Sequence, residues 1–304
     1  MKARYGAAVA RTPAERAALN WTQIQADADA GITSDFFMVY DWNTGWEQAV
    51  LEYGTYYGWS QMAYFIYGMA DQSGNFQLWN STPLASKSYS IGGKDILIVT
   101  PDNRFPQGST VAAQRAAQGR YFRIKWDYEA GNTWARPDRG QWRWSWYNHT
   151  RGDDYAMDGV FDQAEMWVTE LRLLKAEALF RKGDKAGAAA IINETRVKSN
   201  LSPTDAAGTN TSCVPKLPNG QCGDLFEMLK WEARMEGTFT GPLGNSWYFS
   251  GRGWGDLWKD TPTQLPIPCA EAQVLQLLPC VNNFGGAGGE SAAALSTYKW
   301  NGES

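Results

Sequence analysis

The sequence predicts a mainly α-helical protein in which helix hairpins carry a large irregular region. Two observations lead to this prediction. Residues 162–198 place apolar side chains at helical spacing, and the Gly183-Asp184 pair breaks the pattern into a helical hairpin. Residues 71–149 are instead rich in Gly, Ser, Asn, Pro and Trp, and a long irregular region in a compact protein usually carries function. The 304 residues suffice for one large domain, and we expect a single domain over 1–304.

The N-terminal helices are expected within residues 12–70. Thr12, Pro13 and Glu15 form the start of a capped helix, whose apolar residues recur at helical spacing up to a stop at Gly31. Residues 59–70 are dense in aromatic side chains and predict a buried helix. The region 12–70 therefore supplies apolar helix surface for the rest of the chain.

Residues 71–161 form the predicted loop-rich aromatic region. Residues 96–99 are at most a short strand, and residues 101–108 have the composition of a loop. Residues 141–147 alternate with a period of two, which predicts an extended segment with three indoles on one side. The only histidine, His149, is expected to be an ordinary polar loop residue.

Helices return in residues 162–200, where one helix starts at Asp162 and a second runs from Ala186 to Val197. Asp224 caps a third helix that extends to about Glu236. Residues 224–285 combine this helix with Trp- and Pro-rich loops, in which Trp254 is expected to pack against the third helix. The tail from residue 282 is rich in Gly, Ala and Ser, and we expect it to be loosely ordered.

Composition and charge argue against a nucleic-acid-binding function and draw attention to the aromatic residues. Charged residues make up 20% of the chain and the formal net charge is −4, without any Lys- or Arg-rich run, so a nucleic-acid partner is not expected. The chain contains 16 Trp, 14 Tyr and 12 Phe but one His. Such an excess of indoles either fills a large core or provides flat apolar plates for sugar rings. Both uses are expected here.

The four cysteines predict two locally closed disulfide loops, Cys213–Cys222 and Cys269–Cys280. Neither pair has the spacing of a metal-binding motif, so no metal site and no cofactor are expected. Two disulfides indicate an oxidising compartment, and the alternative is four free thiols in a cytosolic protein. No apolar run of about 20 residues and no signal peptide is present, so an exported parent protein would carry its signal and lipidated cysteine upstream.

The helical run from Glu170 to Asp184 is similar to one tetratricopeptide (TPR) helix pair. Three further segments follow it: Trp231-Glu232-Ala233-Arg234-Met235-Glu236-Gly237, then Trp247 to Leu257, then Leu265-Pro266-Ile267-Pro268. In order and spacing these segments resemble the C-terminal two-thirds of the SusD/RagB-like outer-membrane nutrient-uptake (starch-binding-like) family. The resemblance covers most of residues 12–285.

This resemblance implies a SusD-like α-helical fold with TPR-like hairpins on one side and a loop-rich face on the other. It implies a non-catalytic protein at the outer membrane, on the cell surface. Such a protein binds an oligosaccharide or polysaccharide and delivers it to a TonB-dependent (SusC-like) transporter. Family members are usually longer and lack the two cysteine loops as a general feature. The absent N-terminal hairpins make self-association plausible.

The candidate ligand-binding residues rest on stacking chemistry and on their loop-rich setting, since the ligand-contacting part of the family varies. Indole and phenol rings would stack on sugars, and polar neighbours would bind sugar hydroxyls. The stacking candidates are Trp79, Trp134, Trp142, Trp144, Trp146 and Tyr147. The hydrogen-bonding candidates are Asn80, Asp138 and Arg143.

Two other functions remain open at this point. A glycan hydrolase could use two carboxylates from the cluster of Asp153, Asp154, Asp158, Asp162 and Glu165, although the same cluster fits a solvated helix entry. A hydrolase with a Ser-His-acid triad is disfavoured because no Gly-x-Ser-x-Gly elbow occurs. A TPR-like scaffold whose aromatic surface binds a partner protein is the third alternative.

Overall fold

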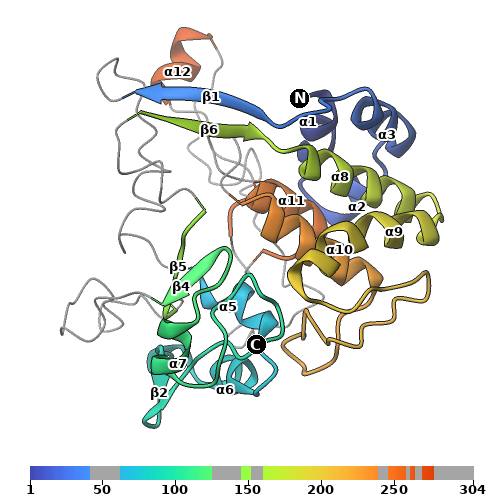
Figure 1. The fold of residues 1–304 in the computed structure, drawn as a ribbon. Coiled ribbons are helices and arrows are strands. Elements are labelled where there is room, and N and C mark those ends of the chain that lie inside the picture. Colours follow the sequence, from blue (N-terminus) through green and yellow to red (C-terminus); the bar gives the residue numbers. More distant parts are fainter. Residues whose placement is uncertain are drawn as a thin grey trace.

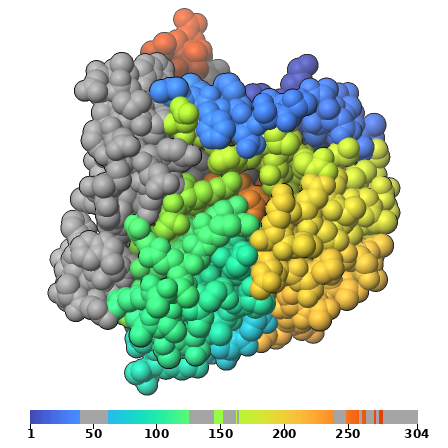
Figure 2. Space-filling model, viewed as in Figure 1, coloured from blue at the N-terminus to red at the C-terminus, as the bar shows by residue number. Residues whose placement is uncertain are grey.

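The computed structural model describes residues 1–41, 62–124, 145–151, 160–238, 246–257, 261–263 and 269–276. Helices dominate these residues, and three two-stranded ribbons accompany them, which confirms the mainly α class. Figure 1 shows a helical layer at the upper right, a second group of short elements below it, and a long ribbon across the top. In the space-filling view of the same face, residues 62–124 form the lower part in cyan and green (Figure 2).

Seven of the helices that the structure describes form the helical layer, and they contact one another in sequence-distant pairs. Helix α8 lies against α3, α9 and α10, and α11 lies against α1 and α2. The bounds are α1 Lys2–Ala8, α2 Pro13–Ala17, α3 Trp21–Asp29, α8 Val168–Arg181, α9 Lys185–Arg196 (followed by the 3-10 turn η6 Val197–Ser199), α10 Leu225–Glu236 and α11 Ser246–Trp254.

The helix expected from Thr12 to Gly31 is two helices. Thr12 caps α2, because its hydroxyl accepts a hydrogen bond from the Glu15 N–H at 3.2 Å. The chain then breaks after α2, and the Asn20 side chain caps α3 by accepting from the Gln23 N–H at 3.0 Å. An Asn that bonds to a nearby backbone N–H starts a new helix rather than continuing the old one. The apolar spacing runs across this break and therefore concealed it.

The predicted helical hairpin is present as α8 and α9. Gly183 ends α8 with a positive φ of 93°, a left-handed conformation that glycine adopts without a Cβ clash. Asp184 then caps α9, because its carboxylate accepts from the Gly187 N–H at 2.8 Å. The Gly-Asp pair thus both stops one helix and starts the next.

The first hairpin helix does not begin at Asp162, so this prediction is wrong. Residues 160–166 form strand β6 (Val160–Met166), which pairs antiparallel with β1 (Phe36–Asp41) in the ribbon at the top of Figure 1. Helix α8 begins after Trp167, and the Asp35 carboxylate accepts from the Val168 N–H at 2.8 Å. Both the strand partner and the capping side chain come from at least 119 residues upstream.

Helix α10 is the element shared by the two halves, and it begins at the predicted cap. The Asp224 carboxylate accepts from the Glu227 N–H at 2.9 Å. Leu225, Met228 and Leu229 pack with α8 and α9, whereas Trp231 and Met235 belong to the aromatic core of the lower half. A helix that is buried on nearly every side joins two layers instead of covering one.

The lower half is built from short elements around an aromatic core. The described part of the helix expected over 59–70 is α5 (Tyr64–Tyr67) and the 3-10 turn η2 (Gly68–Ala70), both buried as predicted. The other elements are α6 Asn75–Ser81, η3 Leu84–Ser86, β2 Ser90–Ile91, β3 Lys94–Asp95, α7 Val111–Ala116, β4 Phe122–Ile124 and β5 Tyr147–His149. A further helix is α12 (Cys269–Val274), drawn above the arrowhead of β1 in Figure 1.

Residues 96–98 are buried and Val99 is half-buried, but the segment forms no strand ladder. The Ile98 N–H donates to the Tyr147 hydroxyl at 2.7 Å, and the Val99 N–H donates to the Asp71 carboxylate at 2.9 Å. Side-chain acceptors thus replace the neighbouring strand that a β-prone segment normally requires. Within the parts of the chain that the structure describes, no helix is long and apolar enough to span a membrane.

The first predicted disulfide is present between Cys213 and Cys222 in the long segment before α10. The predicted Cys269–Cys280 pair lies outside the residues whose side chains are described. We expect a Cys213→Ser, Cys222→Ser double variant to lose about 2–3 kcal/mol of unfolding free energy, because this short loop then gains entropy in the unfolded chain. Urea denaturation with and without reductant checks this, and a stability that is the same in both proteins would contradict it.

Candidate functional site

Three of the predicted stacking residues are core residues, so their assignment to a ligand surface is wrong. Trp79 and Tyr147 are 0% exposed and Trp146 is 8% exposed. Trp79, on α6, lies 5.3 Å from Tyr64 between ring centroids, and the Lys87 ammonium lies 4.2 Å over its ring. These rings therefore fill the aromatic core of the lower half.

Of the segment 141–147, predicted to alternate, the structure describes residues 145–147; all three are buried, so they show no exposed face, and residues 141–144 lie outside the described residues. The Tyr147 hydroxyl donates to the Gln114 side-chain oxygen at 2.6 Å, and the Trp146 indole N–H donates to the Tyr89 carbonyl at 2.9 Å. A strand covered on both sides does not alternate between inside and outside. The neighbouring residue His149 is likewise buried on β5 rather than on a loop, and burial lowers its pKa well below the usual value.

Asn80 is half-buried at the end of α6, where its backbone carbonyl accepts from the Lys87 ammonium at 2.9 Å. Burial lowers the pKa of Lys87 to about 8. The remaining candidates lie outside the described residues, and their role in sugar binding stays a prediction. These are Trp134, Asp138, Trp142, Arg143 and Trp144.

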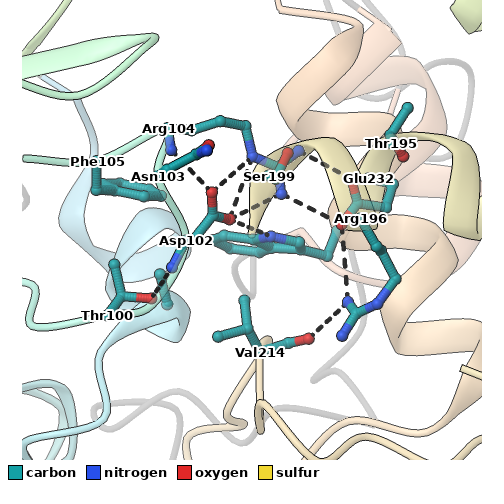
Figure 3. Close-up of polar contacts among 12 residues, drawn as sticks. Thr100, Asp102, Asn103, Arg104, Phe105, Thr195, Arg196, Ser199, Val214 and Glu232 are labelled. Carbon is teal, nitrogen blue, oxygen red and sulfur yellow. Dashed lines mark hydrogen bonds and ion pairs between the residues drawn. The ribbon is translucent and has the colours of Figure 1, made fainter. Parts of the chain in front are cut away.

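A buried charge network attaches the loop at residues 100–105 to α10 (Figure 3). The Arg104 guanidinium binds Asp102 in a bidentate manner, with Nε–Oδ1 at 2.9 Å and Nη2–Oδ2 at 2.7 Å. Its other N–H groups reach Glu232, with Nη1–Oε2 at 2.8 Å and Nη2–Oε1 at 3.2 Å, and Glu236, with Nη1–Oε1 at 3.0 Å. All five N–H groups of Arg104 therefore have a carboxylate acceptor.

Two more side chains complete the charge network. The Arg196 guanidinium lies 3.7 Å from Glu232 and donates to the Val214 carbonyl at 2.9 Å, as Figure 3 shows. The Trp231 indole N–H donates to Asp102 at 3.3 Å. Burial opposes the charge of Arg104, but the surrounding carboxylates outweigh it and raise the pKa of the guanidinium well above its usual value.

The charge network has a structural role rather than a catalytic one, because its side chains are closed off from solvent. Arg104, Asp102 and Glu232 are fully buried. The backbone at Gly119 packs directly against the backbone at Arg104. A Cβ on residue 119 would lie 2.3 Å from the Arg104 carbonyl oxygen. The sequence therefore requires glycine where residue 119 crosses the anchored loop.

Of the carboxylates proposed for a hydrolase, the structure describes only Asp162 and Glu165, and these two do not share an exposed surface. Asp153, Asp154 and Asp158 lie outside the described residues. Asp162 is exposed on β6, whereas Glu165 is buried at a bulge where the register with β1 passes from Met166 to Ala164. Burial raises the pKa of Glu165.

Nor does the rest of the described chain supply a metal-assisted alternative. No group of three or more His, Cys, Asp or Glu residues in the described ranges could hold a metal ion.

A partly exposed series of rings and guanidinium groups is the best candidate for a binding surface. We call it the aromatic–arginine ladder, and it consists of Arg120, Tyr121, Arg151, Trp167 and Phe37. The Arg151 guanidinium lies 4.7 Å from the Tyr121 ring centroid and 4.4 Å from that of Trp167. Arg120 also lies 4.7 Å from Tyr121, and Phe37 meets Trp167 edge-on at 5.5 Å.

Four chain segments build this ladder. Tyr121 precedes β4, Arg151 follows its partner β5, Trp167 joins β6 to α8, and Phe37 lies on β1. On the face drawn in Figure 2, yellow-green atoms lie between the blue N-terminal segment and the green residues of the lower half. No local sequence motif marks this surface. The concentration of Arg and aromatic residues between positions 101 and 151 was the available signal.

Trp254 occupies the place expected for it. The Arg234 guanidinium of α10 lies 5.7 Å from its ring centroid, and its indole N–H donates to Glu177 at 3.1 Å. It therefore lies between α10 and α8 and takes no part in the ladder.

Comparisons with known proteins give no relative for this chain: no protein-family model, no curated protein and no solved structure matches it.

Proposed function

We propose that this chain is a non-catalytic glycan-binding protein of the SusD/RagB kind, acting at the outer membrane on the cell surface. It binds an oligosaccharide or polysaccharide and passes it to a TonB-dependent transporter. The observation that carries this proposal is the packing of the segments on which the resemblance rests. The hairpin α8–α9 contacts α10, and α10 contacts α11, so these three segments form one layer, while Leu265-Pro266-Ile267-Pro268 lies outside the described residues.

The relation of this layer to the loop-rich region adds support. Arg104, in the loop region, forms buried ion pairs with Glu232 and Glu236 of α10, so the loops are fixed to the helical layer. At the edge of these loops the aromatic–arginine ladder combines apolar rings with hydrogen-bond donors. Proteins recognise sugars through surfaces that combine apolar rings with hydrogen-bonding groups.

Tryptophan fluorescence and calorimetry against a panel of soluble polysaccharides test the proposal, with analysis of the glycan afterwards. We expect saturable binding, recovery of the glycan intact, and an affinity about tenfold lower for Trp142→Ala or Trp144→Ala, equivalent to about 1.4 kcal/mol. Trp79→Phe is the matched control, because the buried Trp79 affects stability and should leave the dissociation constant unchanged. Shortened glycan products would overturn the non-catalytic proposal in favour of a hydrolase, and absence of binding would favour a protein-interaction scaffold.

A further inference from the structure

The aromatic–arginine ladder contains donor groups that the described residues of the fold do not use. The Arg151 Nη1 donates to the backbone carbonyls of Glu236 at 2.9 Å and Met235 at 3.5 Å. Among the described residues no acceptor meets its Nε or Nη2, and neither atom is a buried group without a partner. Within the described part of the chain, these N–H groups are therefore not engaged by an acceptor and can bind a ligand oxygen.

The positive charge of the ladder is only partly neutralised. Among the described residues, the carboxylate that faces it is Glu236, which is 7% exposed and already accepts from the buried Arg104 at 3.0 Å and from the Tyr121 hydroxyl at 2.7 Å. Arg120 lies 3.8 Å from this carboxylate, and its side chain is 39% exposed. Because Arg104 already shares Glu236, the charges of Arg120 and Arg151 remain available to an anion.

The sequence concentrates positive charge in the same part of the chain. Between Pro101 and Arg151 there are nine Arg or Lys residues and four Asp or Glu residues, whereas residues 152–165 carry five Asp or Glu residues and no Arg or Lys, and the whole chain has a formal net charge of −4. A local excess of one sign in a chain of the other sign attracts a ligand of complementary charge. The acidic remainder opposes a long polyanion such as a nucleic acid and favours a short charged oligosaccharide.

We propose that the aromatic–arginine ladder binds an anionic glycan, with Arg151 contacting its carboxylate or sulfate group. This inference rests on the proposed glycan-binding function and names the class of glycan. The planar guanidinium matches two oxygens of a carboxylate or sulfate at once. Phe37, which is 40% exposed, and the half-buried Trp167 supply apolar surface for the C–H face of the sugar.

Calorimetry with matched pairs of oligosaccharides tests this inference. The first pair is oligogalacturonate and its methyl ester, and the second is a sulfated carrageenan oligosaccharide and its desulfated form. We expect at least a tenfold preference for the charged member of one pair, weakened by raising NaCl from 20 to 200 mM. The pair that shows the preference identifies carboxylate or sulfate as the recognised group.

Variants of Arg151 separate charge from stacking. We expect Arg151→Gln to abolish the preference for the charged sugar, and Arg151→Lys to keep part of it, because Lys retains the charge but not the planar fork. Arg172→Gln is the control: Arg172 is exposed on α8 and pairs with Glu194 away from the ladder. Circular-dichroism melts confirm that each variant is folded before binding is measured.

The outcomes distinguish this inference from the proposed function. Equal affinity for charged and neutral sugars, unchanged in Arg151→Gln, would overturn the anionic-glycan inference and leave glycan binding intact. Absence of saturable binding to every glycan would overturn both. Tighter binding of a 20-nucleotide poly-dT than of any glycan would overturn both in favour of a nucleic-acid ligand.

Discussion

Replacement of Arg104 by methionine is expected to lower the free energy of unfolding by about 3–5 kcal/mol. The guanidinium is the shared partner of Asp102, Glu232 and Glu236, and it bonds to all three carboxylates in a fully buried position. Methionine fills a similar volume but leaves this negative charge largely uncompensated away from water. Such uncompensated buried charge costs far more than the loss of a surface ion pair.

Urea denaturation of Arg104→Met measures this loss, and Arg172→Met is the matched control. Arg172 pairs with Glu194 at a site where both side chains are over 40% exposed, so its replacement should cost no more than about 1 kcal/mol. Hydrogen exchange should also show faster exchange at residues 100–105, which the network holds against α10. Similar losses in the two variants would mean that the buried charge network does not stabilise the fold.

The features that the sequence predicts well are those determined by neighbouring residues. Thr12, Asp184 and Asp224 each cap a helix through a backbone N–H three residues ahead, and Gly183 ends a helix through its own backbone conformation. These interactions need no distant partner. They could therefore be inferred from residue type and spacing alone.

The features that the sequence does not predict depend on distant partners. Residues 160–166 pair with β1, and Asp35 caps α8 from a distance of 133 residues in the chain. The pattern around Asp162 suits either a helix or a strand, and the partner strand decides between them. Arg104 and Glu232 are similarly 128 residues apart, so their sequence context gives no sign that they are paired in the core.

The same limit applies to the candidate site. Trp79 and Tyr147 have the residue types of a sugar-stacking surface, and their loop-rich context suggested exposure, but both fill the core. Aromatic residues serve both purposes, and only the packing around them separates the two. Conversely, the aromatic–arginine ladder draws Phe37, Tyr121 and Trp167 from separate segments, so no local motif marks it.

Replacement of Glu177 by glutamine should likewise destabilise the protein by about 3–5 kcal/mol at pH 7. Its carboxylate on α8 accepts from Arg16 of α2, with Nε–Oε1 at 2.8 Å and Nη2–Oε2 at 2.6 Å, from Arg181 Nε at 2.8 Å, and from the Trp254 indole of α11. Arg16 is as deeply buried as Glu177. Glutamine keeps the shape of the side chain but removes the charge that compensates this buried guanidinium.

The pH dependence of this loss identifies the charge as its cause. Burial opposes ionisation of Glu177, but Arg16 and Arg181 outweigh it and hold the pKa of the carboxyl below its usual value of 4.5. A carboxyl whose pKa is lower in the folded than in the unfolded chain stabilises the fold above the unfolded pKa, and this contribution is lost as the pH falls through the folded pKa.

The difference in unfolding free energy between the natural protein and Glu177→Gln should therefore be largest near pH 7 and shrink below about pH 4.5. Urea denaturation at pH 7 and pH 3 measures both values, with Glu194→Gln, at the exposed partner of Arg172, as a control expected to lose no more than about 1 kcal/mol at either pH. A difference that stays constant between the two pH values would show that Glu177 is not held ionised by Arg16, and that the loss arises from packing alone.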